Sequence, residues 1–278
     1  LTLAVAHVDH GIVATSAAVA AQVREMAARY GVPVQMRSLG LGPGTSETKA
    51  RRERYRVLRG LQVESRARYL VTAHHADDQI ETVLLRLLKG SGVAGLAGIP
   101  WVAPRGLVRP LLPFRRGELA AWVEGADLPV FQDPTNADLK GERAWIRHEL
   151  LPRLRERFGD RVDQRLLRLV DHAARERRAW SAVLRSLPDL ALRVEGGAAS
   201  LAREPLRRYP DDLAQVLLRG LALEVGCVVG PTRGARLLRF ARQASSGRVA
   251  QLGEHWVAEL VFDRLRLLRR CRSAVLPS

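Results

Sequence analysis

The sequence predicts an α/β protein that begins with a doubly wound, mostly parallel sheet and continues into a smaller, mostly helical domain. In residues 1–89, short apolar runs alternate with amphipathic helical patterns, as in β-α-β units. From Arg143 onward the pattern changes to long Arg- and Leu-rich stretches with apolar residues at helical spacing. The 278 residues, 47% apolar and 27% charged, are typical of a globular protein with one large or two ordinary domains.

The first β-α-β unit is predicted at the start of the chain. Residues 1–8 form a continuous apolar run, which is typical of a strand buried on both faces of a parallel sheet. Ser16 is placed to cap an amphipathic helix that ends at Gly31, and residues 32–36 follow as the next strand.

The same alternation continues after a Gly- and Pro-rich loop at residues 40–44. Residues 47–66 have a strongly charged helical pattern, residues 69–73 form a short apolar strand, and residues 78–89 are a helix that Gly90 ends. Strands that alternate with helices favour a doubly wound α/β domain.

The second part of the sequence predicts two long helices, at residues 146–158 and 162–187. The alternating segments 247–252 and 256–268 predict a small hairpin that closes this domain.

The charge is uneven along the chain. Of 45 basic and 29 acidic residues, residues 151–278 hold 25 and 14, a net charge of +11, whereas residues 1–150 carry only +5. The excess of Arg over Lys can reflect a GC-rich genome, but the net excess favours a polyanionic partner, with nucleic acid ahead of a membrane.

The remaining composition excludes several classes. No apolar stretch approaches the roughly 20 residues that a membrane helix needs, and no signal sequence opens the chain, so we expect a cytoplasmic protein without membrane contact. The two cysteines, Cys227 and Cys271, lie far apart and lack metal-ligand spacing, which indicates neither a disulfide framework nor a structural zinc site.

The densest polar cluster is TAHHADDQIETV at residues 72–83, where a predicted strand ends and a helix begins. Ligands bind at this edge of an open parallel sheet. His74 and His75, which end the strand beside the carboxylates of Asp77 and Asp78, could hold a divalent ion and orient a phosphate or a proton donor. Alternatively, Asp78 is the N-cap of the helix and Glu81 completes a capping box.

Two further clusters have both a functional and an ordinary interpretation. His7, Asp9 and His10 lie at the C-terminal end of the first strand, where a polar turn is also expected. The segments DPTNAD and IRHELLP contain the remaining candidates, which are Asp133, Asn136, Arg143 just before the second segment, Arg147 and His148. An Asx turn at Asp133 and a solvated helix start at Arg143 are the ordinary interpretations.

Taken together, these segments resemble one family. AHVDHG, ARRERYRVL, TAHHADDQIETVLLRLLKGSGVAGLAGI, RPLLPFRRGEL, DPTNAD and IRHELLP are similar to signature segments of the bacterial tRNA(Ile)-lysidine synthetases, members of the PP-loop ATP pyrophosphatase superfamily. Beyond about residue 160 the resemblance is one of length and character only.

The resemblance implies a Rossmann-like PP-loop catalytic domain at residues 1–158, a connecting helix at 159–187 and a basic tRNA-binding domain at 188–278. It implies a carbon–nitrogen ligase that uses ATP and Mg²⁺ to adenylate C2 of the wobble cytidine of an isoleucine tRNA with a CAU anticodon. L-lysine then displaces AMP and gives lysidine. Oligomeric state stays open, a homodimer included.

The family's site residues carry over by position. His74, Asp78 and Arg143 would be catalytic, and Asp78 would also bind Mg²⁺. His7 joins His74 and Asp78 in binding ATP. The substrate-binding residues implied by the resemblance are Asp133, Asn136, Arg147 and His148.

The sequence departs from the family in two places. The Ser-Gly-Gly-x-Asp-Ser phosphate loop does not occur in these residues, so we expect a segment before Leu1 that carries it. At Ala144 and Trp145 the family usually has Asn and Arg, which bears on the role of Arg143.

Two alternative functions remain. A tRNA thiolation enzyme of the same superfamily would need a thiolate, and residues 1–150 contain no cysteine, which favours lysidine formation. A non-catalytic tRNA-binding remnant is the alternative if Leu1 is the true start.

Overall fold

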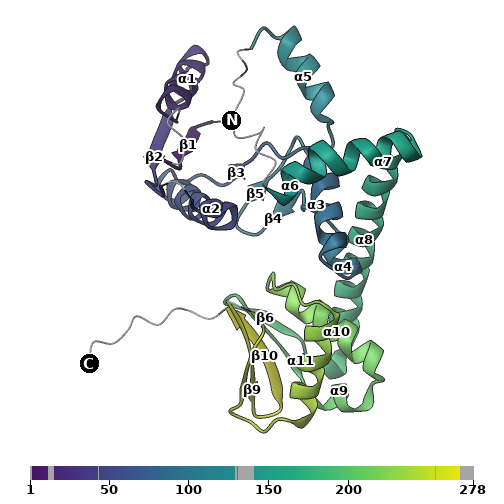
Figure 1. The fold of residues 1–278 in the computed structure, drawn as a ribbon. Coiled ribbons are helices and arrows are strands. Elements are labelled where there is room, and N and C mark those ends of the chain that lie inside the picture. The colour runs from purple at the N-terminus through teal and green to yellow at the C-terminus, as the bar shows by residue number, and fades with distance from the viewer. Residues whose placement is uncertain are drawn as a thin grey trace. The chain divides into compact units, whose positions relative to one another are not determined.

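Figure 1 shows the fold in a computed structural model that describes residues 2–11, 16–42, 44–128, 130, 141–253 and 255–269. The chain divides into two compact units. The first unit comprises Leu1–Asp77 and Pro100–Ala137, and the second comprises Asp78–Ile99 and Asp138–Ser278. None of the helices in the described ranges has the length and apolar character needed to cross a membrane.

The first unit contains short strands with helices between them. Its described elements are β1 (Val5–Asp9), α1 (Ser16–Arg29), β2 (Val34–Ser38), α2 (Glu47–Glu64), β3 (Leu70–Val71), β4 (Val102–Ala103), β5 (Leu107–Val108) and α5 (Arg116–Gly125). β1 pairs with β2 and β3 with β5 in parallel, while β4 joins β5 antiparallel. The α/β class and the parallel pairing predicted from the sequence are confirmed.

The first β-α-β unit follows from local sequence chemistry. Gly31 adopts a φ of +63° after α1, which lets the chain reverse, and the Val32 amide donates to the Ala27 carbonyl. β2 begins at Val34, two residues later than predicted, because Pro33 has no amide hydrogen to donate. The Pro33 carbonyl accepts a hydrogen bond from the amide of Val5, which is the first residue of β1.

The second unit combines helices with an antiparallel sheet. Its helical elements are α3 (Ala76–Leu88, whose first two residues belong to the first unit), α4 (Val93–Leu96), α6 (Glu142–Trp145), a π-helical turn (Ile146–Leu150), α7 (Leu151–Phe158), α8 (Arg161–Ser186), a 3₁₀ turn (Pro188–Leu190), α9 (Glu204–Arg208), α10 (Asp211–Glu224) and α11 (Pro231–Gln243). Its strands are β6 (Arg193–Glu195), β7 (Ala198–Ala202), β8 (Val249–Gln251), β9 (Trp256–Val261) and β10 (Arg264–Arg269).

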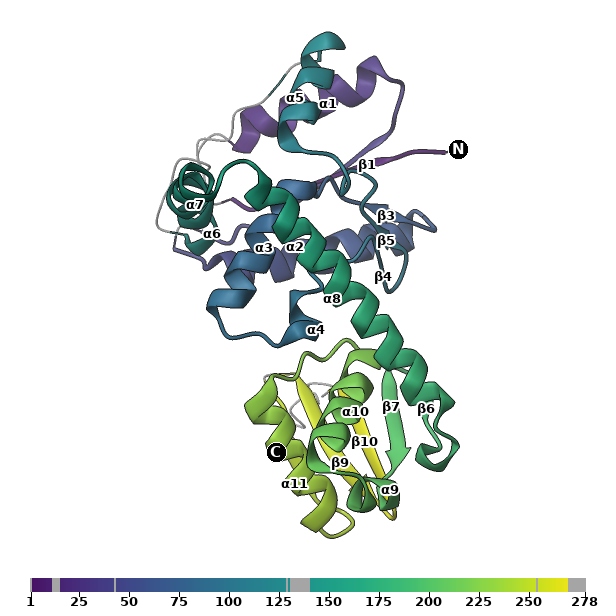
Figure 2. The ribbon, with the colours of Figure 1, turned by 90° about the vertical axis from the view of Figure 1, so that its right-hand side faces the viewer.

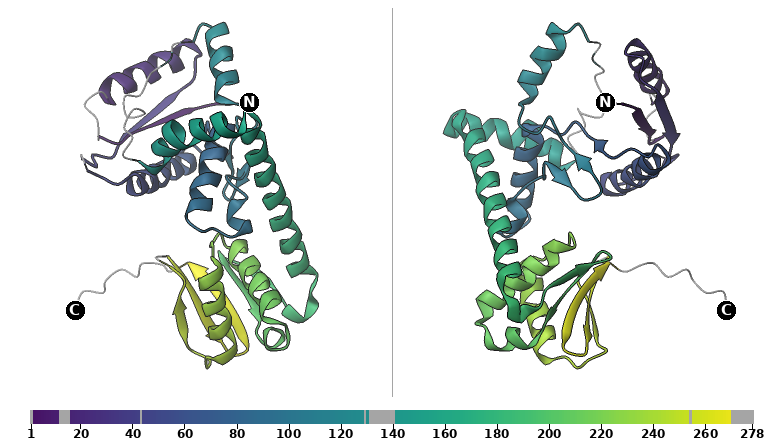
Figure 3. Two further views of the ribbon diagram at one scale, coloured as in Figure 1. Left: turned by 45° about the vertical axis from the view of Figure 1, so that its right-hand side comes forward. Right: turned by 180° about the vertical axis from the view of Figure 1, so that it is seen from behind.

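The five strands form one antiparallel sheet in the order β6-β7-β10-β9-β8, and α10 and α11 cover one of its faces (Figures 2 and 3). Along β10, Leu265 and Leu267 are buried whereas Arg266 is exposed, which is the alternation expected of a sheet covered on one side. The core between sheet and helices includes Leu201, Leu217, Leu221, Leu237 and Leu260. This part of the chain is mostly helical, as expected, but the predicted hairpin, formed by β9 and β10, belongs to a five-stranded sheet.

The two long helices predicted in the second part are confirmed, with a change at their joint. α7 and α8 are separated by Gly159, which has a φ of +76°. Arg155 reaches from α7 to the buried Asp163 on α8 with its Nε 3.2 Å from Oδ1 and its Nη2 2.9 Å from Oδ2. This bidentate ion pair restrains the angle between the helices more than a single hydrogen bond would.

α3 packs within the second unit through one buried face. Ile80 and Leu84 of α3 form a small core with Ile146 and Leu151. The buried amide of Gln79 donates to the Ile99 carbonyl at 2.7 Å and accepts from the Ile99 amide at 2.6 Å, so it satisfies both backbone groups of that residue.

The chain passes this glutamine at Gly98, which adopts a φ of +62°. We expect Gly98→Ala to lower the free energy of unfolding by about 2 kcal/mol, since a left-handed backbone is strained for other residues. The new Cβ would also lie 2.2 Å from Gln79 Oε1. Urea unfolding measures the change. Gly117→Ala is the control, because its Cβ meets nothing within 4 Å; equal stability of the two variants would contradict the argument.

Candidate active site at the strand ends

His74 lies just beyond β3 and is held between two side chains. Its Nδ1 is 3.0 Å from Thr72 Oγ1, and its Nε2 is 3.3 Å from Arg51 Nη2. A guanidinium has only donors, so Nε2 must accept. The proton of the ring is then on Nδ1 and is donated to Thr72. These contacts define a neutral imidazole of one tautomer with a fixed orientation.

Helix α2 brings positive charge to the ends of two strands. It starts at the N-cap Ser46, whose side chain accepts from the Lys49 amide. Arg51 and Arg54, three residues apart on α2, lie on one face of the helix. Arg51 contacts His74 beyond β3, and Arg54 acts on His10 beyond β1.

The electrostatics of His10 reflect this arrangement. Burial lowers the pKa of His10, and the positive charge of Arg54 lowers this pKa further. Arg51 and Arg54 thus place positive charge beyond the ends of β3 and β1, which favours an anion there.

The predicted candidate His7 lies on β1, half-buried and opposite Met36 of β2. It is close enough to His10 to contribute to the lowered pKa of that residue. Asp9 accepts a hydrogen bond from the Gly11 amide at 2.8 Å, so the polar-turn interpretation holds for the residues after the strand.

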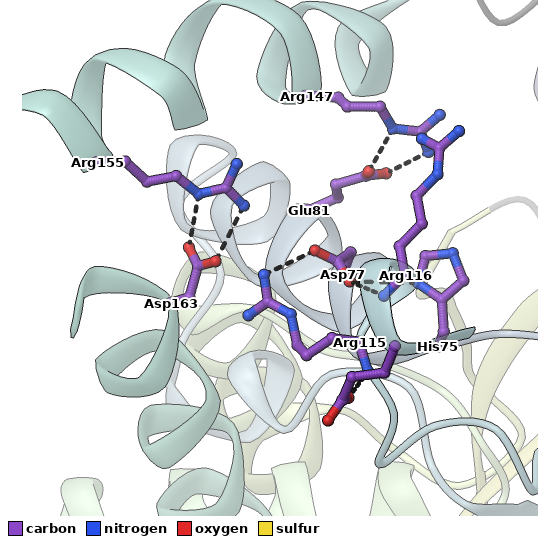
Figure 4. A network of polar contacts seen from close by, with 9 residues as sticks. His75, Asp77, Glu81, Arg115, Arg116, Arg147, Arg155 and Asp163 are labelled. Carbon is purple, nitrogen blue, oxygen red and sulfur yellow. Dashed lines mark hydrogen bonds and ion pairs between the residues drawn. The ribbon is translucent and has the colours of Figure 1, made fainter. Parts of the chain in front are cut away.

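The start of α3 differs from the predicted capping box. The helix begins at Ala76, whose amide donates to the Phe114 carbonyl at 2.8 Å, so Asp78 is in the first turn and is not the N-cap. Asp77 instead accepts from Arg115 Nη2 and from the Arg116 amide, both at 2.8 Å (Figure 4). Because Arg116 is the first residue of α5, Asp77 supplies from another helix the carboxylate that caps α5.

His75 lies beside this contact. Its Nδ1 is 3.8 Å from Asp77 Oδ2, and both side chains are largely buried (Figure 4). Two of the four polar residues at positions 74–78 are thus tied to the packing around α5, whereas His74 is tied to α2.

Glu81 has a different role from the one its spacing indicated. Its carboxylate is 1% exposed and accepts from Arg147 Nε at 2.6 Å and from Arg147 Nη2 at 3.2 Å (Figure 4). The capping box between Asp78 and Glu81 is therefore wrong, because Glu81 is used to anchor Arg147. The sequence signal for burial at position 81 is that Leu84 and Leu85, three and four residues further along the helix, share its face.

Arg147 and His148 lie in the π-helical turn between α6 and α7. The Leu151 amide donates to the Ile146 carbonyl, five residues back, as in a π-helix. Pro152 at the start of α7 has no amide hydrogen for an α-helical bond to His148, which favours the wider turn. π-turns inside helices are frequent at functional sites.

The other predicted site residues are placed as follows. Arg143 is in α6, close enough to Arg86 for its charge, together with burial, to lower the pKa of Arg86. Asp133 and Asn136 lie outside the described residues. The sequence did not single out Arg51 and Arg54, because a helix rich in Arg and Glu is typical of a solvent-exposed helix.

The described residues offer different groups to a nucleotide and to its metal ion. The guanidinium groups of Arg51 and Arg54 offer the N–H donors that phosphate oxygens accept. No group of three or more His, Cys, Asp or Glu that could hold a metal occurs among the described residues. Mg²⁺ needs only one or two carboxylates when phosphates complete its shell, so Asp78 fits a nucleotide-bound ion and not a site built from protein alone.

Comparison with known proteins defines the class. Residues 1–154 match the family model of the PP-loop domain, so the parallel strands and the polar strand ends described above belong to a PP-loop fold. A solved structure of the U34-tRNA thiolase NcsA from Methanococcus maripaludis has the same fold, with a TM-score of 0.52 over 63% of each chain and 15% identity.

Curated relatives define the family more closely. A tRNA(Ile)-lysidine synthase from Novosphingobium aromaticivorans is 36% identical over 263 residues, which cover 89% of this chain and 75% of the relative. The chain belongs to the tRNA(Ile)-lysidine synthase family. Members from Solibacter usitatus and Alkalilimnicola ehrlichii are 36% and 38% identical over 79% and 86% of this chain. The chain spans about half the length of these two relatives, 50% and 49%.

Proposed function

We propose that this protein ligates L-lysine to C2 of the wobble cytidine of an isoleucine tRNA with a CAU anticodon, giving lysidine. The observation that carries the proposal is the family match, which includes both the PP-loop domain and most of the basic part of the chain. ATP would supply the adenylyl group that activates the cytidine oxygen, with AMP and diphosphate as products.

In the first unit, Arg51 and Arg54 would bind phosphate oxygens of ATP. His74 accepts from Arg51 Nη2 and thereby orients the guanidinium, while Thr72 fixes the imidazole. His7 would contribute to the same positive strand end through its proximity to His10. Preorganised donors of this kind stabilise the charge that spreads over a phosphorus centre in the transition state.

Asp78 would be the protein carboxylate that faces a nucleotide-bound Mg²⁺. Its position in the first turn of α3 suits a carboxylate, because a helix N-terminus attracts negative charge. Asp77 is already engaged at the start of α5, since each of its oxygens accepts a hydrogen bond, one from Arg115 and one from the Arg116 amide.

The tRNA and lysine would bind to residues around the π-helical turn. Arg143 would hold phosphate in the transition state, and Arg147 with His148 would bind substrate, with the direction of the Arg147 guanidinium set by Glu81. Asp133 and Asn136 remain the predicted residues for lysine and cytidine.

The basic second part would supply tRNA affinity through phosphate contacts. Residues 151–278 carry a net charge of +11, from 25 basic and 14 acidic side chains. Binding through such contacts weakens steeply with salt because counterions are released. The predicted division into a catalytic domain at 1–158, a connecting helix at 159–187 and a tRNA-binding domain at 188–278 stays part of this proposal.

The thiolation alternative is disfavoured by cysteine chemistry. The first 150 residues contain no cysteine, and burial raises the pKa of the Cys227 thiol to about 11. A thiol with such a pKa is a poor nucleophile at neutral pH, since the thiolate is the reactive form.

The proposed function is tested with the full product of the gene, a CAU isoleucine tRNA transcript, ATP and lysine. We expect AMP release that requires both tRNA and lysine, and lysidine in the nuclease-digested tRNA detected by mass spectrometry. tRNA binding without AMP release would instead favour a non-catalytic tRNA-binding protein. Incorporation of sulfur in place of lysine would favour thiolation.

The same assay tests the α2 arginines. We expect Arg51→Gln to weaken ATP binding about tenfold or more, because a charge-assisted hydrogen bond contributes about 1.5–3 kcal/mol. Equilibrium dialysis with labelled ATP measures this affinity. Arg52→Gln is the matched control, since Arg52 neighbours Arg51 on the same helix but pairs with Glu53 at the surface. Equal ATP affinities of the two variants would remove Arg51 from the nucleotide site.

A further inference from the structure

A cavity lies wholly within the second unit. Its volume is about 400 Å³, which is in the range of small-molecule sites. The loop between α3 and α4, one face of α8, one face of α10 and the segment that leads into α11 line it, and we call it the α8 pocket. α4 and α10 both pack against α8, as Figure 2 shows.

The lining of the α8 pocket is strongly basic. It includes Lys89, Arg177, Arg219 and Arg233 but only one carboxylate, Glu176. Lys89 forms an ion pair with Glu142. Arg177 has neither an ion pair nor a hydrogen bond to any other residue that the structure describes.

The guanidinium groups near the pocket are partly buried and repel one another electrostatically. Burial lowers the pKa of Arg177, and the charge of Arg178 lowers it further. Burial, Arg143 and Arg177 together lower the pKa of Arg86, which donates to the Gly95 and Gly98 carbonyls under the α3–α4 loop. An anion in the pocket would relieve this repulsion, because opposite charges stabilise each other most where water is scarce.

The pocket also offers an apolar surface of the size of a ring. The half-buried Trp180 lines it from α8, next to the aliphatic side chains of Val216 and Leu223 from α10. Val93 and Val228 complete this surface and are 47% and 58% exposed. A ligand that carries both an aromatic ring and a phosphate matches the two halves of the lining.

The backbone permits a close approach on two sides. Gly92 is the N-cap of α4 and Gly230 is the N-cap of α11, and neither residue places a side-chain cap on the helix amides. At Gly92 a Cβ would point toward Arg219, 3.9 Å from Nη1. Small residues at these positions keep the pocket open next to its arginines.

We propose that the α8 pocket binds one nucleotide of the RNA substrate, other than the cytidine that is modified, with its base against Trp180 and its phosphate at Arg177 and Arg219. This inference rests on the proposed function for the identity of the RNA. The surrounding net charge of +11 in residues 151–278 favours a nucleotide within a polyanion over a free nucleotide, because one phosphate would not balance that excess.

The test is the affinity of the full chain for a CAU isoleucine tRNA transcript, measured by filter binding without ATP or lysine. We expect Trp180→Ala and Arg177→Gln each to weaken binding about fivefold or more, the lower limit for loss of a stacked base. Trp180→Phe should restore most of the affinity, because phenylalanine also stacks. Arg177→Gln should also reduce the slope of log affinity against log salt by about one.

The matched control is Arg175→Gln, which removes the same charge from an exposed position two residues away on α8. Equal losses for the Arg175 and Arg177 variants would show that only bulk charge matters and would overturn the proposal. Unchanged tRNA binding of Trp180→Ala would do the same. So would Trp180-dependent binding of free AMP or CMP with no effect on tRNA affinity, because the ligand would then be a free nucleotide.

Cross-linking gives a second readout that does not depend on variant stability. A transcript containing 4-thiouridine should cross-link to peptides that carry residues 89–95 or Trp180. If the unaltered protein binds tRNA in this way but forms no lysidine, the proposed function fails and the α8 pocket stands. If it forms lysidine and no cross-link reaches the pocket, the reverse holds.

Discussion

Asp78→Asn should lower the single-turnover rate of tRNA adenylation at least about 100-fold in the full product of the gene. The substitution keeps the shape of the side chain but removes the carboxylate that is proposed to face Mg²⁺. The neighbouring Asp77 should not replace it, because its oxygens already accept hydrogen bonds at the start of α5. The free energy of unfolding should change by less than about 1 kcal/mol, because asparagine keeps the size and an accepting oxygen of aspartate and a helix–dipole interaction contributes at most about that much. Adenylated tRNA is quantified in rapid-quench samples, and stability by thermal unfolding.

The control for this prediction is Asp171→Asn, an exposed carboxylate on α8. It removes the same charge from the protein without touching the strand ends, so the rate should stay within about twofold of the unaltered enzyme. A normal adenylation rate in the Asp78 variant would remove this residue from the magnesium site. His74→Ala should act in the same direction as Asp78→Asn, since it releases Arg51 from its fixed orientation.

Arg147→Met should lower the free energy of unfolding by about 3 kcal/mol, because it leaves the Glu81 carboxylate buried without its partner. Methionine retains the apolar length of the arginine stem, so the loss reports mainly on charge. Urea unfolding of the chain measures the difference. The double variant Glu81→Gln with Arg147→Met should recover at least about half of the lost stability, since a neutral amide costs less to bury than a carboxylate.

An exposed ion pair nearby provides the comparison. Arg153 and Glu149 form an i,i+4 pair in which Arg153 is 76% exposed. Arg153→Met should therefore change the unfolding free energy by only about 0.5 kcal/mol or less. If the Arg147 and Arg153 variants lose the same stability, the pair with Glu81 does not hold the π-helical turn in place.

The sequence predicted the fold best where local chemistry decides it. The first β-α-β unit was predictable because an apolar run, a helical period and Gly31 all indicate the same boundaries. β6 and β7 were not, because Arg193–Glu195 is exposed and polar while Ala198–Ala202 consists of small residues with high helix propensity. Those strands exist through their pairing with β10, which is a tertiary effect.

The candidate site divides in a similar way. His74 and Asp78 could be singled out because polar residues crowd the end of a predicted strand, and their roles remain predictions. Arg51 and Glu81 could not be assigned correctly from spacing. Arg51 resembles any arginine of a solvated helix until His74 is placed opposite it. Glu81 satisfies a sequence rule for helix caps, and only its burial against Arg147 shows another use.

The π-helical turn has a consequence for how this region tolerates insertions and deletions. It accommodates one residue more than an α-helix of the same rise, and each residue in a helix rotates the chain by about 100°. Deleting one residue from Ile146–Leu150 would let the backbone return to regular α-helical bonding. Because the turn absorbs this extra residue, the helices on either side of it would keep nearly their present angle after the deletion. A residue deleted from the regular helix α7 between Leu151 and Arg155 would instead rotate Arg143 by about 100° relative to Arg155. One residue can therefore be lost from the π-helical turn, and not from α7, without changing the angle between the two arginines.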